Sequence, residues 1–146
     1  MTGHSVFRSS FGSIGARLGF PLRQVDVAWL RTLSDQLRPL GVSPGRTAAL
    51  FFIENNPGCS QARLGEALRI NRPSTARAVD ELVALGAVER RKASPKARDN
   101  ALFLTDHGRT LHTRIDALAE AHEAAFFAPL SASERERLRT LLLKLL

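Results

Sequence analysis

The sequence contains one cysteine, one tryptophan and no tyrosine in 146 residues. The single cysteine, Cys59, excludes an internal disulfide and a zinc site built from several cysteines. No apolar run of about 18 residues is present, so no membrane-spanning helix is expected. The N-terminus also lacks the basic-then-apolar pattern of a signal peptide, which favours a cytoplasmic protein.

Internal repeats and low-complexity linkers are absent as well, so we expect a single domain over residues 1–146. Acidic residues are comparatively scarce: 14 Asp and Glu stand against 21 Lys and Arg, which gives a formal net charge of +7. This excess favours an anionic partner, and nucleic acid before a membrane surface. Hydrophobic residues at 44% and charged residues at 24% are typical of a folded globular chain.

Apolar periodicity and helix-capping residues predict a mainly α chain. A flexible arm is expected over about residues 1–20, followed by a helix that begins at Pro21 and ends near Arg38, since Pro39 disfavours helical geometry just before it. A long helix should end at about Phe127. Five capping residues mark where the later helices begin: Ser43, Ser60, Asn71, Thr105, and Ser131 in a capping box with Glu134.

The helices that begin after Ser60 and Asn71 are separated by only about two to three residues. This spacing forces the sharp angle of a helix-turn-helix. Short β-compatible segments follow at 87–92 and 100–105, and they predict a hairpin with a long tip. We therefore expect a winged helix-turn-helix over about residues 44–105, in a mainly α fold with a small β-hairpin wing.

The densest positive charge lies on this hairpin. Five basic residues fall between positions 90 and 98 with no acid among them, and like charges this close repel one another. Against a polyanion the same cluster becomes favourable through counterion release, and a narrow minor groove attracts an inserted arginine. The alternative is an ordinary solvated loop. The cluster consists of Arg90, Arg91, Lys92, Lys96 and Arg98, and we expect Arg98 to enter the groove.

The second helix of the motif offers residues that suit base reading. We expect its N-terminal half to present these residues on the side away from Val79 and Leu82, where an arginine can pair with guanine and hydroxyls can contact phosphates or base edges. They are Arg72, Ser74, Thr75 and Arg77. Alternatively, Ser74 only supports the helix start and Arg72 pairs with a nearby acid. Ser60 and Gln61 are candidates for phosphate contacts, although capping alone explains Ser60.

Other candidate sites have less support. Cys59 fits a hydrophobic staple on Leu64 better than a redox switch, because no second cysteine is present to resolve a sulfenic acid. The four histidines lack metal-ligand spacing, and neither catalytic residues nor a cofactor site is predicted. Arg23 and Trp29, with Phe51 and Phe52, could bind an aromatic carboxylate; the alternative is that the aromatic residues are plain core.

Four pieces in order resemble the MarR family of bacterial transcription regulators: "PGCSQARLGEAL", "RINRPSTARAVDELVALGAVERR", "LFLTDHGR" and "LSASERERL". The resemblance implies a homodimer formed through the N- and C-terminal helices (about residues 21–40 and 106–146) that binds a palindromic operator in double-stranded DNA. It implies a recognition helix in the major groove, a wing in the minor groove, and a small phenolic or aromatic carboxylate effector. Lys96 departs from the family, which usually has an acid two positions before the wing arginine.

The leading hypothesis is a sequence-specific, homodimeric DNA-binding repressor released by a small ligand. The alternative is a ligand-insensitive architectural or anti-repressor protein that uses the same fold for protein–protein contact. An enzymatic function has no support, because the sequence contains no nucleophile–base pair, phosphate-binding loop or metal cluster.

Overall fold

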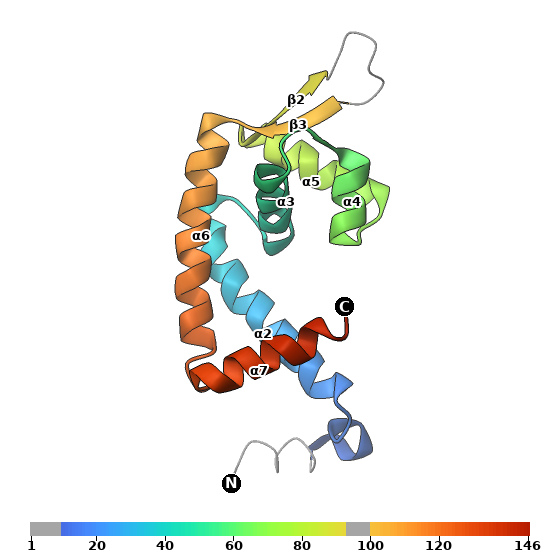
Figure 1. The fold of residues 1–146 in the computed structure, drawn as a ribbon, viewed down its shortest axis with the longest axis vertical. Helices are drawn as coiled ribbons and strands as arrows, with labels where there is room; N and C mark the ends of the chain where they lie inside the picture. Colours follow the sequence, from blue (N-terminus) through green and yellow to red (C-terminus); the bar gives the residue numbers. More distant parts are fainter. Residues whose placement is uncertain (1–9, 93–99) are drawn as a thin grey trace. The chain divides into compact units, whose positions relative to one another are not determined.

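The computed structural model describes residues 10–92 and 100–146 and divides into two compact units, residues 1–36 and 37–146. Figure 1 shows a mainly helical chain with a small sheet, which confirms the predicted fold class. In the part of the chain that is described, no helix combines the length and apolarity that a membrane crossing needs.

The N-terminal unit contains most of helix α2, Gly19–Leu37. The helix begins two residues before Pro21, which sits in the first turn where its missing N–H is not needed. The prediction of a flexible arm over about residues 1–20 is wrong in part, because residues 10–15 are also helical. The ring of Phe11 in this segment lies 4.7 Å from that of Phe20. Residues 1–9 lie outside the described residues. Four apolar side chains of α2 are exposed in the single chain: Leu22, Val25, Val27 and Leu30.

The second unit contains the remaining helices, and the caps predicted from the sequence are confirmed. Each capping side chain accepts a hydrogen bond from the backbone N–H three residues ahead. The capping box of Ser131 with Glu134 is present. The helices are η1 (Arg38–Leu40), α3 (Pro44–Asn55), α4 (Gln61–Leu68), α5 (Arg72–Ala84), α6 (Asp106–Phe126) and α7 (Ala132–Leu143).

A three-stranded antiparallel sheet joins the helices, with the strand order β1-β3-β2. The predicted hairpin is confirmed as β2 (Val88–Lys92) and β3 (Asn100–Leu104), in a register that pairs Val88 with Leu104. The two-residue strand β1 (Cys59–Ser60) pairs with the other edge of β3 and was not predicted, because two residues carry no periodicity. The segment 93–99 between β2 and β3 lies outside the described residues.

The core of the second unit forms where α3, α4, α5 and α6 meet the sheet. Helix α3 packs against α5, α6 and β3, and α4 packs against α5. Burying this apolar surface supplies most of the stabilisation. The largest fully buried side chains are Leu37, Leu50, Ile53, Leu64, Leu82, Leu102 and Ile115. His122 of α6 is also buried.

Candidate nucleic-acid interface

The helix-turn-helix depends on a close approach of α4 to α5. A Cβ at Gly65 would lie 2.7 Å from Oγ1 of Thr75, so only glycine lets the two helices pack this tightly. Thr75 is 1% exposed, and its hydroxyl donates to the carbonyl of Asn71 at 2.9 Å. The prediction that Thr75 lies on the side away from Val79 and Leu82 is therefore wrong: it shares their buried face and positions the helix pair.

The start of α5 is fixed by Asn71, whose side-chain oxygen accepts the N–H of Ser74 at 2.9 Å. Arg72 and Ser74 are exposed in this first turn. Within residues 10–92 and 100–146 no acid lies within ion-pair distance of Arg72, so the alternative that it is held by a neighbouring carboxylate has no support there. These two polar side chains remain available to an external partner.

Arg77 follows one turn later and is held on its own helix. Its Nε donates to Oε1 of Glu81 at 3.1 Å, while 82% of the Arg77 side chain remains exposed. The other carboxylate oxygen of Glu81 accepts a hydrogen bond from Nε of Arg46 on α3. The Arg46 hydrogen bond, followed by that of Arg77, holds the pKa of Glu81 below its usual value. Glu81 is therefore a charged carboxylate between two guanidinium groups.

A pocket of about 600 Å³ lies between α4, α5 and the sheet, and four exposed or half-buried predicted residues line it. Two come from the start of α4, one from α5 and one from β2, so residues far apart in sequence meet on one surface. Thr75 also lines the same pocket. The four are Ser60, Gln61, Arg72 and Arg90. Sequence reasoning missed Arg63, which is exposed in the first turn of α4 and donates to Asn56 at 3.4 Å.

The arginines at the base of the wing are each paired with an acid. Arg90 forms an ion pair with Asp80 of α5, which ties β2 to α5. Arg91 pairs with Glu89, and its guanidinium lies 4.8 Å from the centre of the Phe103 ring. Neither acid was singled out from the sequence. Lys96 and Arg98 lie outside the described residues, so their predicted contacts stay predictions.

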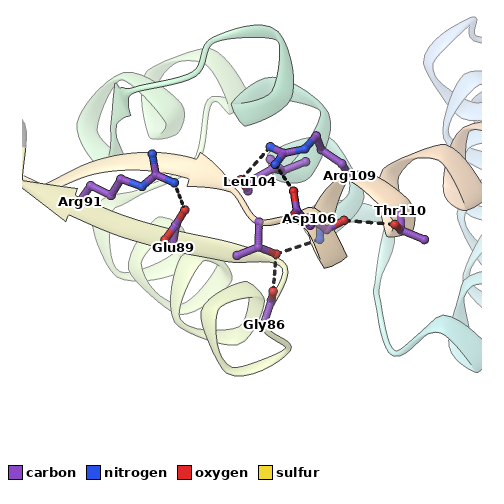
Figure 2. A network of polar contacts seen from close by, with 9 residues as sticks. Gly86, Glu89, Arg91, Leu104, Asp106, Arg109 and Thr110 are labelled. Carbon is purple, nitrogen blue, oxygen red and sulfur yellow. Dashed lines mark hydrogen bonds and ion pairs between the residues drawn. The ribbon is translucent and has the colours of Figure 1, made fainter.

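Figure 2 shows how the wing leads into α6. Arg109 donates to the carbonyl of Leu104 at 3.1 Å and also pairs with the carboxylate of Asp106. The hydroxyl of Thr105 donates to the carbonyl of Gly86 and accepts the N–H of Gly108. This network fixes the end of β3 and the first turn of α6 to the loop that precedes β2.

Gly108 is required in this network by its closeness to another backbone. A Cβ at this position would lie 1.9 Å from the carbonyl oxygen of Ala87, an overlap that no rotamer change removes. The same carbonyl accepts the N–H of Thr105 at 3.1 Å. The glycine of the "DHGR" segment is therefore explained by close packing against the backbone of Ala87, without a role in binding.

The predicted effector residues fall on different elements. Arg23 lies 3.6 Å from Asp26 on α2, and both side chains are more than half exposed. Trp29, on the same helix, is half-buried. Phe51 of α3 packs against the ring of His112 on α6, with 4.0 Å between centroids. The assignment of an effector site to Arg23 and Trp29 stays a prediction.

Cys59 lies in β1 and is buried. Desolvation raises the pKa of its thiol, against a smaller opposing effect of Arg63. A raised pKa disfavours the reactive thiolate. Elsewhere in the described chain, no three histidine, cysteine or acidic side chains come together in a way that could hold a metal ion.

Comparison with known proteins identifies this arrangement. A family model described as MarR family matches residues 40–99. A putative transcriptional regulatory protein for the hcr operon of Thauera aromatica is 33% identical over 135 residues, which cover 92% of this chain and 81% of that protein.

Two solved structures share the fold. The transcriptional repressor CouR, bound to a 23-mer DNA duplex, is 26% identical with a TM-score of 0.87, covering 93% of this chain and 96% of that one. A MarR family protein of Mycobacterium tuberculosis in complex with salicylic acid is 28% identical with a TM-score of 0.72, covering 88% of this chain and 96% of that one. The chain belongs to the MarR family of winged helix-turn-helix, DNA-binding transcription regulators.

Proposed function

We propose that the protein is a homodimeric repressor that reads a palindromic operator with α5 and its wing. The observation that carries this proposal is the exposed polar face at the N-terminal half of α5, where Arg72, Ser74 and Arg77 stand beside the pocket that Ser60 and Arg90 line. Exposed arginines on a helix that fits a major groove are suited to guanine.

The roles divide by position. Arg77, on the exposed side of α5, reads base edges, whereas Arg72, Ser74, Ser60 and Gln61 contact phosphates and set the register. On the wing, Arg98 enters the minor groove and Lys96 adds positive charge towards the DNA, and Arg90 and Arg91 stiffen the base of the hairpin. The wing part of this proposal rests on the charge cluster of the sequence and on the family.

Dimerisation is proposed to involve the apolar faces of α2 and α7. Helix α7 exposes Leu138, Leu141 and Leu142, which is more apolar surface than one subunit of this size should leave in water. The relative crystallised with salicylic acid supports a small aromatic acid as the effector that releases DNA. Such a regulator acts in the cytoplasm, where its operator lies, and it acts without an enzymatic step.

The proposal is tested by comparing Arg77→Ala and Arg98→Ala in fluorescence-anisotropy titrations against operator and random duplexes at several salt concentrations. Arg77→Ala should cost about 1–3 kcal/mol per half-site on the operator and much less on random DNA. Arg98→Ala should weaken binding to the operator and to random DNA alike, and should reduce the slope of log affinity against log salt concentration by about one unit per lost contact. Equal losses on both duplexes for Arg77→Ala would contradict its role in base reading.

A further inference from the structure

Glu81 of α5 lies where α5 contacts α3 and is bonded to an arginine from each of these helices. Each of its carboxylate oxygens accepts one arginine: Oε2 takes Nε of Arg46 from α3, and Oε1 takes Nε of Arg77 one turn earlier on α5. The side chains of Arg46 and Glu81 are both 30% exposed, whereas that of Arg77 is 82% exposed. Arg46 and Glu81 thus form a half-buried anchor, and Arg77 projects from it.

The geometry points to Glu81 as a positioning residue for Arg77, with Arg46 fixing the carboxylate. This inference rests on the proposed base-reading role of Arg77. An arginine with this exposure samples many rotamers unless a neighbour holds its guanidinium, and ordering it only on binding lowers the affinity gained from a bidentate contact. Glu81 restrains Arg77 through Nε, which leaves the two terminal nitrogens of the guanidinium free for the fork that guanine accepts.

The pairing with Arg46 explains why an acid is tolerated beside a DNA-reading side chain. An isolated carboxylate near the phosphates would repel every DNA sequence alike. A carboxylate held by a second guanidinium from another helix is largely neutralised, and its orientation is set before DNA arrives. Because Arg46 belongs to α3, a displacement of α3 against α5 would loosen Arg77 without any direct contact to it.

A purely structural role predicts a different outcome. If Glu81 only joined α3 to α5, its neutralisation would lower stability and remove one negative charge, which would raise affinity for operator and random DNA by the same factor. A positioning role instead changes the ratio of the two affinities. That ratio is the informative measurement.

The experiment compares Glu81→Gln with the charge-matched control Glu66→Gln, which removes one exposed acid from the adjacent helix α4. Affinities of the full-length dimer for operator and random duplexes are measured by anisotropy, alone and in the Arg77→Ala background. Glu81→Gln should lower the ratio of operator affinity to random-DNA affinity about two-fold per half-site, which corresponds to the free energy of one exposed i,i+4 pair. For the dimer, with two half-sites, the ratio should fall about four-fold. Glu66→Gln should change both affinities by the same factor.

With Arg77 removed, Glu81→Gln should have no further effect on the ratio, and Arg46→Ala should act in the same direction as Glu81→Gln. Circular dichroism and the dimer mass establish that each variant is folded, and Arg46→Gln, which removes the charge but keeps a long polar side chain, replaces Arg46→Ala if the latter does not fold. An unchanged ratio in Glu81→Gln, or an equal drop with and without Arg77, overturns the inference. An Arg77→Ala variant that keeps full specificity refutes base reading by Arg77, and with it the function on which the inference rests.

Discussion

The contact between Gly65 and Thr75 makes a strong prediction about how tightly the two helices of the motif must pack. A methyl group at Gly65 would lie 2.7 Å from Oγ1 of Thr75 and 3.4 Å from the carbonyl oxygen of Ile70, whereas a relaxed contact needs about 3.5 Å or more. Thr75 cannot turn away freely, because it is buried and its hydroxyl is bonded to Asn71. Overpacking of this kind costs about 1–3 kcal/mol.

Gly65→Ala also gains about 1 kcal/mol of helix propensity, so its net effect is a destabilisation of about 0–2 kcal/mol. The coupling with Thr75 is the sharper quantity. In a Thr75→Ala background the 2.7 Å contact is removed, and only the slightly close contact with the Ile70 carbonyl remains. The backbone N–H of residue 75 still donates to the Asn71 carbonyl, so Gly65→Ala should there stabilise by up to about 1 kcal/mol.

Urea denaturation of the four variants at one protein concentration, followed by circular dichroism, gives this coupling energy. Gly45→Ala in α3 is the matched control, since a Cβ there meets nothing within 4 Å, and it should be neutral or mildly stabilising in both backgrounds. If Gly65→Ala changes the free energy of unfolding equally with and without the Thr75 hydroxyl, the reasoning is refuted.

Four further outcomes are expected. Leu142→Asp on the exposed face of α7 should convert a dimer of about twice 16.0 kDa into monomers in light scattering and abolish operator binding with it. An aromatic acid found by thermal shift should lower operator affinity about 5–150-fold, and Arg23→Ala should blunt that change. Gly108→Ala should lower the melting temperature strongly, because its Cβ would overlap the Ala87 carbonyl. Burial raises the pKa of the Cys59 thiol above its unfolded value of about 8.5. The stability that the buried thiol contributes is therefore present below the unfolded pKa and is lost as the pH rises through the folded pKa. Iodoacetamide should react slowly with Cys59 at pH 8, and the free energy of unfolding of Cys59→Ala should decline less at high pH than that of the unsubstituted protein.

The helix boundaries followed closely from the sequence because capping is local. A Ser, Thr or Asn side chain needs only the N–H three residues ahead of it, and the predicted caps from Ser43 to Ser131 all make that bond. The hairpin could be predicted for a similar reason, since its strands are short and close in sequence. Strand β1 could not, because its pairing of Cys59 with Leu102 joins residues 43 positions apart that share no pattern.

The prediction that Thr75 faces DNA was wrong, and its spacing in the sequence already indicated a buried position. Thr75, Val79 and Leu82 are spaced by four and three residues, which places all three on one face of a helix. A hydroxyl in that series suggested DNA contact, but it bonds to the preceding turn and packs against Gly65 instead. The partners of Arg46 and Arg90 had no such signal, because these pairs join different helices and strands and depend on how those elements pack. The Arg77–Glu81 pair was readable, since the two residues are four positions apart on one helix.

Those pairings change what the basic composition of the chain means for DNA binding. Four arginines of α3, α5 and β2 are paired with acids in the free protein, so their charge is already partly compensated and their counterion release on DNA binding is small. In the described part of the second unit, the cations for which no acidic partner is found include Arg63, Arg72 and Lys92. The steep salt dependence of binding should come from such unpaired cations and from the wing tip. The paired arginines then contribute to sequence specificity more than to overall affinity, because a guanidinium that is oriented before DNA binds favours one arrangement of hydrogen-bond acceptors over another. The paired arginines are Arg46, Arg77, Arg90 and Arg91.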